Sequence, residues 1–436
     1  MNFPDKELLN KKFVSGFEIL PFVYYQIMGN LNNETGAQSQ FPQVSKMNKL
    51  YRLIKAIPFF RIRKCSTLIF STTVFNVKIG DIYKNTLHGY YKDLNPEGVL
   101  LIEDPTLMDV NWKIKRPDDS GINYFFIIIS KFIAAICNKI KKRHSADYDI
   151  FISTFPDLFT LSNLSFKDYY YQIYSFFIKK LIKKTKCHQV IINCGSYGFD
   201  YASIIIAARS LGVKTIDVQH GMILNHIAYS ASDEIASYKN YYNFLPDELW
   251  TFGEYWSNQV SWRYQKIVVG NPYLLDFQYK YINTAIETDY LIISQAADKI
   301  EVIIGDYVDK LATAFPNSRI CLRLHPVETI DVYKWLLNKH TKIVYSTFDK
   351  VVLYEDIAKS KFVIGINSTC LFESIALDKT PIIIDCEESR RTMPKDLGIW
   401  NSNPSDLTDI INKENQIDKD YWWYPDFNTK VSQLLS

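Results

Sequence analysis

Histidines, hydroxyl side chains and one glutamate stand directly after short apolar segments that predict buried β-strands. His220 follows the segment 213–218 (VKTIDV) and lies in the tripeptide Gln219-His220-Gly221. Histidine readily acts as a general base near neutral pH, and a glycine lets a ligand approach the backbone closely. A histidine that is merely held by loop carbonyls fits the same position, so position alone leaves both interpretations open.

A second histidine, His325, follows the segment 320–324 (ICLRL) and is itself followed by Pro326. An imidazole at the end of a strand can donate a hydrogen bond to a phosphate oxygen. Arg323 is a candidate for the same anion, although a structural ion pair is the more common role for such an arginine.

Asn367, Ser368 and Thr369 follow the apolar segment 362–366 and precede a helical pattern that contains Glu373. Small hydroxyl residues commonly cap a helix, and the amide N–H groups and dipole at a helix N-terminus also bind anions. Glu373, one turn further on, is either an acceptor for two ribose hydroxyls or an ordinary solvated helix residue.

Several fingerprints of other chemistries are missing from the sequence. It has no GxGxxG, no GxxxxGK[ST] and no GxSxG, and no His/Cys cluster with the spacing of a metal site. Dinucleotide binding, nucleoside triphosphate hydrolysis and a nucleophile elbow are therefore not indicated. We expect no cofactor and no metal.

The elements that must position these residues are strands and helices in alternation. Segments 189–193, 199–211 and 213–218 predict strand, helix and strand, which is a βαβ unit with a parallel sheet. A second alternating series runs from 290 to 385. Ligands of open parallel sheets bind beyond the carboxyl ends of the strands, where the candidate residues stand.

The first part of the chain is predicted with less detail. A short helix is expected at 46–57, and two buried strands at 67–71 and 98–103 enclose a segment, 80–94, that we predict to be mostly helical.

Three motifs occur in order at predicted strand ends: QHG at 219–221, RLHP at 323–326 and NSTCLFESIALDKTP at 367–381. Together they resemble the GT-B-fold glycosyltransferases of bacterial surface-polysaccharide synthesis, which include sialyl-, polysialyl- and Kdo-transferases, and the related teichoic-acid polyol-phosphate polymerases. The HP motif of these groups matches His325-Pro326, and their Ser-Ser or Ser-Thr motif matches Ser368-Thr369.

Two further segments are similar to motifs of these enzymes. QHG is similar to the WHG motif of the polymerases, and FESIALDKTP is similar to the FEAxxxGKP segment of nucleotide-sugar enzymes, with Glu373 at the ribose-binding glutamate and Asp378 in place of the usual glycine. The Asp/Glu-Asp/Glu-Gly motif of several sialyltransferases has no match, because the sequence at 118–121 (DDSG) is off by one residue.

The resemblance implies a GT-B-like α/β fold, with two Rossmann-like domains whose parallel sheets face each other across a cleft. It implies a metal-independent, inverting glycosyltransferase of capsule or lipopolysaccharide synthesis. The donor would be a nucleotide-activated sugar, with a CMP-sugar slightly favoured, and the acceptor a saccharide or lipid-linked saccharide.

The resemblance and the strand-end positions together assign roles. His220 and His325 are the expected catalytic residues, with His220 as the base. The expected donor-binding residues are Arg323, His325, Pro326, Asn367, Ser368, Thr369 and Glu373. The expected acceptor-side or cleft residues are Gln219, Gly221, Asp200, Asp217 and Glu254, of which the three carboxylates are weaker candidates for the base.

The expected domain organisation has three parts. Residues 1–275 form an N-terminal, acceptor-side Rossmann-like domain, and residues 276–414 form a C-terminal domain that binds the nucleotide sugar. Residues 415–436 form an aromatic segment and a helix that pack back on the N-terminal domain.

Composition sets the class of protein and its compartment. The chain has 436 residues, of which 47% are hydrophobic and 22% are charged, enough for sizeable cores. Its net charge of only +3 gives no overall positive electrostatic field that would attract nucleic acid. The seven cysteines include no CxxC, so reduced thiols are expected. No signal peptide is recognised, and a cytoplasmic location is expected.

The most apolar stretch, 124–140, is interrupted by Lys131 and Asn138. It is shorter than the ~20 apolar residues that a membrane-spanning helix needs. Two interpretations remain open, a buried helix and a helix on the membrane surface. The second would place the protein at the cytoplasmic face of the inner membrane, as a peripheral contact.

Three alternative functions remain. One is a polyol-phosphate transferase. Another is a sugar-nucleotide 2-epimerase, which shares the two-domain fold and a helix-borne glutamate but needs several acid/base carboxylates that the sequence does not place. The third is a non-enzymatic, sugar-binding scaffold subunit of a polysaccharide complex.

Overall fold

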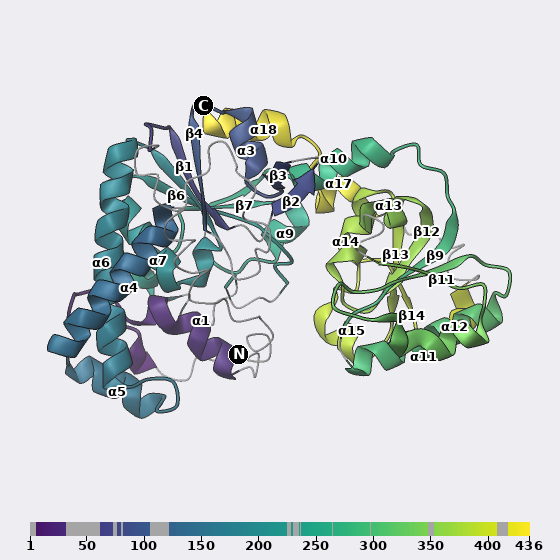
Figure 1. The fold of residues 1–436 in the computed structure, drawn as a ribbon, viewed down its shortest axis with the longest axis horizontal. Coiled ribbons are helices and arrows are strands. Elements are labelled where there is room, and N and C mark those ends of the chain that lie inside the picture. Colours follow the sequence, from purple (N-terminus) through teal and green to yellow (C-terminus); the bar gives the residue numbers. More distant parts are fainter. Residues whose placement is uncertain are drawn as a thin grey trace. The chain divides into compact units, whose positions relative to one another are not determined.

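The computed structural model describes residues 6–31, 62–72, 76–79, 82–104, 122–224, 228–229, 235, 237–263, 265–296, 298–347, 353–407 and 417–436. The chain divides into two compact units (Figure 1). Unit 1 comprises Met1–Thr251, Ser257–Val269 and Asp426–Ser436, and unit 2 comprises Phe252–Trp256 and Gly270–Pro425. The predicted helix at 46–57 and the DDSG sequence at 118–121 lie outside the described residues.

Unit 1 contains a six-stranded parallel sheet with the order β4-β1-β5-β6-β7-β8. Its strands are β1 (Thr67–Thr72), β4 (Val99–Asp104), β5 (Gln189–Asn193), β6 (Lys214–Val218), β7 (Glu248–Thr251) and β8 (Gln265–Val268). All five residues of β5 are buried, as expected for a parallel strand covered on both faces. Because β1 pairs with β4 on one side and with β5 on the other, the strand order reverses between β1 and β5.

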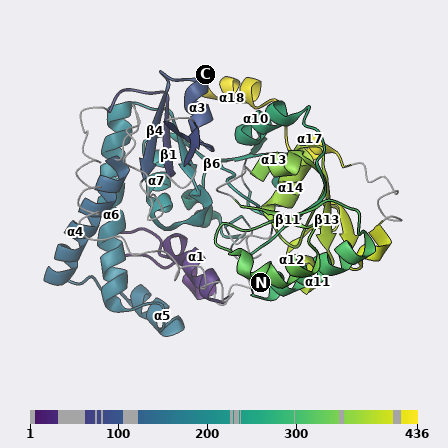
Figure 2. The same ribbon diagram turned by 45° about the vertical axis from the view of Figure 1, so that its right-hand side comes forward.

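The helices of unit 1 precede, connect and cover these strands. They are α1 (Leu20–Leu31), α3 (Gly89–Leu94), α4 (Ile122–Ile140), α5 (Ala146–Thr154), α6 (Leu161–Thr185), α7 (Phe199–Arg209) and α18 (Phe427–Leu435), and the short α9 (Glu254–Asn258) straddles the unit boundary. Helices α4 and α6 lie side by side (Figures 1 and 2). They run antiparallel, since Phe126 stacks on Phe177 and Asn138 bonds Ser162.

The prediction of a mostly helical segment at 80–94 is wrong in its first half. Residues Ile82–Asn85 form strand β3, which pairs antiparallel with β2 (Asn76–Ile79), and the helix begins only at Gly89. The IYKN sequence of β3 does not alternate polar and apolar residues, so its strand form follows from its pairing with β2.

Unit 2 contains a second six-stranded parallel sheet, with the order β11-β10-β9-β12-β13-β14. Its strands are β9 (Thr288–Ile293), β10 (Ile320–Arg323), β11 (Val344–Ser346), β12 (Ser360–Gly365), β13 (Thr380–Ile384) and β14 (Ile399–Asn401). Here the order reverses between β9 and β12, because β10 and β11 lie on one side of β9 and β12 to β14 on the other.

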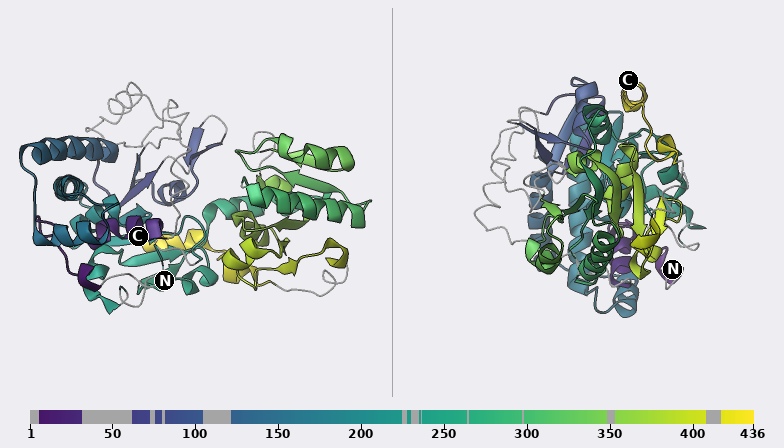
Figure 3. Two further views of the ribbon diagram at one scale, coloured as in Figure 1. Left: turned by 90° about the horizontal axis from the view of Figure 1, so that it is seen from below. Right: turned by 90° about the vertical axis from the view of Figure 1, so that its right-hand side faces the viewer.

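The helices of unit 2 are α10 (Pro272–Tyr281), α11 (Asp298–Ala314), α12 (Lys334–Lys339), α13 (Leu353–Ala358), α14 (Thr369–Ala376), α15 (Glu387–Thr392) and α17 (Lys419–Trp422). They cover the sheet on both sides (Figure 3). One face packs against α11 and α12, with Ile292, Ile304 and Leu336 in its core. The strand order of both sheets confirms the predicted α/β fold with two Rossmann-like domains.

The C-terminal segment belongs to both units. In unit 2, the Trp256 indole donates to the carbonyl of Trp422 at 2.9 Å, and a Cβ on Gly253 would lie 2.2 Å from that same carbonyl oxygen. The final helix, α18, belongs to unit 1, where the carbonyl of Leu435 accepts a hydrogen bond from Asn95 at 3.3 Å. The chain therefore crosses from unit 2 to unit 1 just before α18.

Candidate functional site

The carboxyl ends of β9, β10 and β12 in unit 2 bring together most of the expected donor-binding residues. β9 lies between the other two strands, so the loop after β10, which carries His325, and the loop after β12, which carries Asn367 and Ser368, flank it. The backbone N–H of Asn367 donates to the Gln295 side chain after β9 at 3.2 Å. This is the switch point of the sheet, where open α/β sheets bind ligands.

His325 is exposed, and its loop is held by Glu328, a residue that the sequence analysis did not select. One carboxylate oxygen of Glu328 accepts from the backbone N–H of His325 at 2.6 Å, and the other accepts from Ser294 Oγ at 2.7 Å. The N–H of Val327 donates to His325 Nδ1 at 3.5 Å. A ring whose Nδ1 accepts this contact carries its N–H on Nε2, which can donate to an anionic oxygen. Pro326 is exposed beside it.

Arg323, an expected donor-binding residue, points into the interior of unit 2 in the structure. Its side chain is buried, and Nη1 pairs with Asp356 Oδ2 at 2.8 Å and with the carbonyl of Thr347 at 3.2 Å. Ser346 Oγ donates to the same Asp356 oxygen at 2.5 Å. Burying a guanidinium requires such a partner, so Arg323 links β10 to α13 and has a structural role.

Ser368, Thr369 and Asn367 surround the N-terminus of α14. Ser368 is the N-cap, and its hydroxyl accepts from the N–H of Cys370 at 3.3 Å. Thr369 is exposed. The Oδ1 atom of Asn367 is buried and has no hydrogen-bond partner among the described residues. Hydroxyl, amide and helix-dipole groups thus gather where an anion is stabilised.

Glu373 lies one turn into α14, beneath aromatic residues of α10 and α13. Burial raises the pKa of its carboxyl group to about 7, against the opposing effect of a hydrogen bond from Tyr354. The Tyr354 ring is itself held by stacking on Phe277, with ring centroids 4.3 Å apart. Near neutral pH this carboxyl group is therefore poised between its acid and its carboxylate.

Asp378 stands where the FEAxxxGKP segment usually has a glycine, and its backbone conformation explains why an aspartate fits there. Asp378 follows the C-terminus of α14 with φ 57°, the left-handed region that glycine adopts freely. Aspartate and asparagine are among the few other residues that enter this region readily. Asp378 therefore keeps the turn that the resemblance assigns to glycine.

In unit 1, His220 follows β6 and is partly exposed. Its Nε2 lies 3.5 Å from Cys194 Sγ and 3.4 Å from the Tyr197 hydroxyl. Burial, with Asp217 nearby, raises the pKa of the Cys194 thiol well above its ordinary value. Cys194 is therefore a neutral thiol and not a nucleophile, which leaves the partly exposed imidazole of His220 as the candidate base of this loop.

The turn from β5 to α7, which carries Cys194, is strained. Cys194 and Phe199 have positive φ angles of 58° and 50°, and Gly198, with φ 78°, approaches the carbonyl of Pro21 so closely that a Cβ would lie 2.1 Å from its oxygen. Non-glycine residues with positive φ angles concentrate at ligand-binding sites.

Asp217, an expected acceptor-side or cleft residue, also points into the interior of its unit. Asp217 is fully buried, and one oxygen accepts from the N–H and the hydroxyl of Ser196 at 3.0 and 2.6 Å. Burial raises the pKa of its carboxyl group to about 6, while the Ser196 hydrogen bonds lower it. A buried carboxylate needs hydrogen-bond donors. The turn supplies them through Ser196, so these two hydrogen bonds also tie the strained turn to β6.

The remaining acceptor-side candidates are spread out. Gln219 is buried, and its amide donates to the carbonyl of Gly221 at 2.9 Å, which shapes the loop that carries His220. A Cβ on Gly221 would meet nothing within 4 Å, so packing inside the protein does not require a glycine there. Glu254 is exposed at the start of α9 and belongs to unit 2, not to the unit that holds His220.

A buried polar network that the sequence analysis missed lies at the carboxyl ends of β1 and β4. Ser71 Oγ and His88 Nδ1 are 2.8 Å apart, and the Asn85 amide donates to Ser71 Oγ at 3.1 Å and to Glu103 Oε1 at 2.7 Å. Burial, with His220 nearby, lowers the pKa of His88 to about 3, so His88 is neutral. Ser71 and Glu103 each stand at the end of a predicted strand, which was the available signal.

A cavity of about 260 Å³ opens at the switch point between β1 and β5. It is lined by Phe70, Ser71, Thr72, Asn123, Ile127, Tyr174, Asn193, Phe199, Asp200, Tyr201 and Ile204. Asn193 Oδ1 is buried and without a hydrogen-bond partner among the described residues. Burial raises the pKa of Asp200, while Lys131 and Tyr170 act in the opposite direction. The cavity therefore offers oxygen acceptors between aromatic walls.

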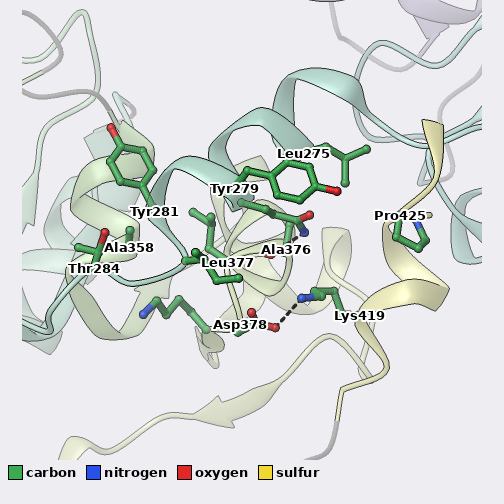
Figure 4. A pocket seen from close by; sticks show the side chains of 13 residues that line it. Leu275, Tyr279, Tyr281, Thr284, Ala358, Ala376, Leu377, Asp378, Lys419 and Pro425 are labelled. Carbon is green, nitrogen blue, oxygen red and sulfur yellow. Dashed lines mark hydrogen bonds and ion pairs between the residues drawn. The ribbon is translucent and has the colours of Figure 1, made fainter. Parts of the chain in front are cut away.

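A second cavity, of about 290 Å³, lies elsewhere in unit 2, between α10, the end of α14 and α17 (Figure 4). Asp378 and Lys419 form an ion pair of 2.8 Å at its wall. Its residues Ala376 to Lys379 directly precede β13, so it opens at the amino ends of the strands. It is thus at the opposite edge of the sheet from His325 and Ser368.

In the described part of the chain, no group of three or more His, Cys, Asp or Glu side chains is placed to hold a metal ion. Two Asp-x-Asp sequences occur at 147–149 and 418–420. Asp147 accepts from the Lys12 N–H at 2.9 Å and Asp149 pairs with His144, while Asp418 caps α17. Three of these four aspartates are thus in local structural contacts.

Comparison with known proteins reveals likeness in structure only. No protein-family model and no curated protein matches the chain. Solved structures that align with it include a UDP-GlcNAc 2-epimerase from Neisseria meningitidis (12% identity, 85% of this chain and 99% of that chain, TM-score 0.48) and a putative one from Listeria monocytogenes (10%, 85% and 94%, 0.49). MurG of Acinetobacter baumannii also aligns (9%, 85% and 99%, 0.47). The fold class stated above rests on the strand order of the two sheets.

Proposed function

We propose that this chain is a metal-independent, inverting glycosyltransferase that transfers a sugar from a nucleotide-activated donor to a saccharide acceptor. The observation that carries the proposal is the grouping of His325, Asn367 and Ser368 at the switch point of the unit 2 sheet, with Glu373 one helical turn away. Groups that donate hydrogen bonds to an anion suit the phosphate of a nucleotide, and a carboxylate one turn away suits its ribose.

In the proposed reaction, unit 2 holds the nucleotide. The His325 Nε2–H, the Ser368 and Thr369 hydroxyls and the N-terminus of α14 stabilise the phosphate that leaves. Glu373 accepts hydrogen bonds from the ribose. Preorganised donors of this kind stabilise the charge that develops in the transition state. A CMP-sugar remains the favoured donor because of the sequence resemblance.

Unit 1 supplies the acceptor site and the base. The cavity at the β1/β5 switch point offers Asn193 Oδ1 and the Asp200 carboxyl group to sugar hydroxyls, and its aromatic walls suit the apolar faces of a pyranose. Asn193 is followed directly by Cys194, which touches His220. His220 would remove the proton of the attacking acceptor hydroxyl, so that one displacement inverts the anomeric centre.

The biological setting is proposed from the resemblance as well. The acceptor would be a growing capsule or lipopolysaccharide chain, free or lipid-linked, and the reaction would take place in the cytoplasm with a peripheral contact at the cytoplasmic face of the inner membrane.

Incubation with candidate sugar nucleotides tests the proposed reaction against its rivals. Melting temperatures measured with CMP, UDP, GDP and CDP first identify the nucleotide, since a ligand that binds only the folded state stabilises it. The corresponding sugar nucleotide is then supplied with saccharide acceptors. Transfer supports the proposal, isomerisation of the donor indicates a 2-epimerase, transfer of a polyol phosphate indicates the polymerase class, and binding without turnover indicates a scaffold subunit.

Nucleotide affinity is expected to increase about tenfold between pH 6 and pH 8, because ribose hydroxyls need the carboxylate form of Glu373 and its pKa is raised to about 7. In the Glu373→Gln variant the affinity should be lower and independent of pH, while turnover at saturating donor changes little. Calorimetric titration at the two pH values measures both. Equal affinities and equal pH profiles for wild type and variant would make Glu373 an ordinary helix residue.

The raised pKa of the Glu373 carboxyl group also predicts how the stability of the ligand-free protein changes with pH. The folded state holds the Glu373 proton more tightly than the unfolded state, so the free energy of unfolding should fall as pH rises from about 4.5 to 7. Replacement by glutamine should remove this contribution.

Transfer is expected to survive excess EDTA, because His325, the two hydroxyls and the N-terminus of α14 are proposed to replace a divalent cation at the leaving phosphate. Initial rates with and without chelator measure this. Loss of activity that magnesium or manganese restores would contradict the proposal.

A further inference from the structure

Helix α4 exposes more apolar surface than is usual for a helix on the surface of a protein. The helix has 19 residues, two more than the predicted apolar stretch 124–140, so that by length and composition alone it could cross a membrane. Only 28% of its most apolar stretch is buried in the structure. Phe132, Ile136 and Ile140, spaced by four, are 62%, 44% and 80% exposed, and residues at this spacing share one face of a helix. Phe176 on the neighbouring helix α6 is 54% exposed.

The opposite face of α4 is committed to unit 1. Asn123 accepts a hydrogen bond from the Tyr174 hydroxyl of α6 at 2.7 Å, Phe126 stacks on Phe177 with ring centroids 5.2 Å apart, and Ser130 and Ala134 are buried. A helix that crossed a bilayer would have to leave these contacts and take Lys131, at its middle, into hydrocarbon. The geometry therefore favours a helix that lies along a surface.

The charges around this face have one sign. Residues 122–146 and 161–186, which hold α4, α6 and their flanks, contain eleven Lys and Arg residues and one acidic residue, in a chain whose net charge is only +3. The acidic residue, Asp168, is paired with Arg143 at 2.9 Å. On α5, Asp147 lies 3.7 Å from Lys11 and Asp149 lies 2.9 Å from His144. The exposed lysines of this region are Lys131, Lys139, Lys141, Lys142, Lys180, Lys183, Lys184 and Lys186.

We propose that the docking face, formed by Phe132, Ile136, Ile140, Phe176 and these exposed lysines, binds a bilayer that contains anionic phospholipids. An apolar stripe flanked by lysines lies in the headgroup plane, with its rings and aliphatic groups among the upper acyl chains. The lysines are attracted to anionic headgroups, each by about fivefold in affinity. The inference gives a surface to the membrane contact in the proposed function, and vesicle binding requires no transfer reaction, so each can fail without the other.

Co-sedimentation of the full chain with vesicles tests this proposal. Vesicles of phosphatidylcholine with about 30 mol% phosphatidylglycerol should retain the protein, and pure phosphatidylcholine should retain far less. Binding should weaken as salt rises, because screening shortens the reach of the lysines to about 10 Å at 0.1 M. Absence of binding to the anionic vesicles at low salt would overturn the proposal.

Two multiple variants and their matched controls separate the apolar and the charged contributions. Changing Lys139, Lys141 and Lys142 to Ala should weaken binding on the order of 100-fold, and Phe132→Ser with Ile136→Ser should weaken it at least about tenfold. The matched controls in unit 2 replace the exposed residues Lys299, Lys310 and Lys395 by Ala, and Val302 and Val344 by Ser. These should bind as wild type does.

Sedimentation equilibrium without lipid addresses the rival occupant, a second copy of this chain. The proposal expects the Phe132/Ile136 variant to keep the association state and the melting temperature of wild type. A wild-type dimer that this variant dissociates, with vesicle binding unchanged, would overturn the proposal in favour of a protein interface.

Discussion

The His220→Ala variant is expected to lose transfer by roughly 100- to 10,000-fold, the usual effect of removing a general base. A base acts in the transition state only, so turnover and catalytic efficiency should fall together. Nucleotide affinity should stay nearly unchanged, because His220 belongs to unit 1 and the proposed phosphate and ribose contacts belong to unit 2. Transfer rates and calorimetric titration of the nucleotide measure the two effects.

The matched control for this experiment is His188→Ala. His188 is exposed and directly precedes β5, so it lies at the amino edge of the same sheet whose carboxyl edge carries His220. Its replacement should leave transfer unchanged. If nucleotide binding collapses in the His220 variant, His220 is a donor ligand. If transfer persists, the residue is structural and Asp200, at the wall of the cavity, becomes the next candidate.

His325→Ala should lower the transfer rate on the order of 100-fold or more, as expected when one donor to a developing charge is removed. The side chain is exposed and the loop is held through the backbone N–H by Glu328, so the fold should survive the truncation. Rates and melting temperature are measured together. A folded variant with the turnover of wild type would refute the assignment.

The control for His325 is His340→Ala in the same unit. His340 is a partly buried histidine whose Nε2 bonds Asp309 at 2.6 Å, and it follows α12, away from the carboxyl ends of the strands. Its loss should lower stability slightly without affecting the rate. The comparison separates a catalytic effect from the general consequence of losing an imidazole.

The order of apolar segments along the chain was sufficient to predict the fold class. Continuous runs such as QVIIN and FVIGI are typical of strands buried on both faces of a parallel sheet, and helical segments between them require crossovers of one hand. The pairing of 76–79 with 82–85 escaped prediction because antiparallel pairing of two four-residue strands is set by the partner strand more than by local preference.

The candidate site was only partly predictable for a related reason. Position after a strand selects His220, His325 and Ser368, because carboxyl ends meet at one edge of a parallel sheet. It does not reveal whether a polar side chain then turns inward. Arg323 and Asp217 were selected by position, yet both side chains are buried against partners far away in the sequence, Asp356 and Ser196.

The sequence by itself determined the alternation of strands and helices, the positions of the strand-end histidines and the basic, apolar character of residues 122–146, because these are properties of neighbours along the chain. Only the tertiary structure decided that Glu328 holds the His325 loop, that Asn193 faces a cavity and that Phe132 and Ile136 stay exposed. Burial and hydrogen bonding depend on which distant segments meet, and a carboxyl group such as Glu373 acquires its pKa of about 7 only from the environment that those segments build.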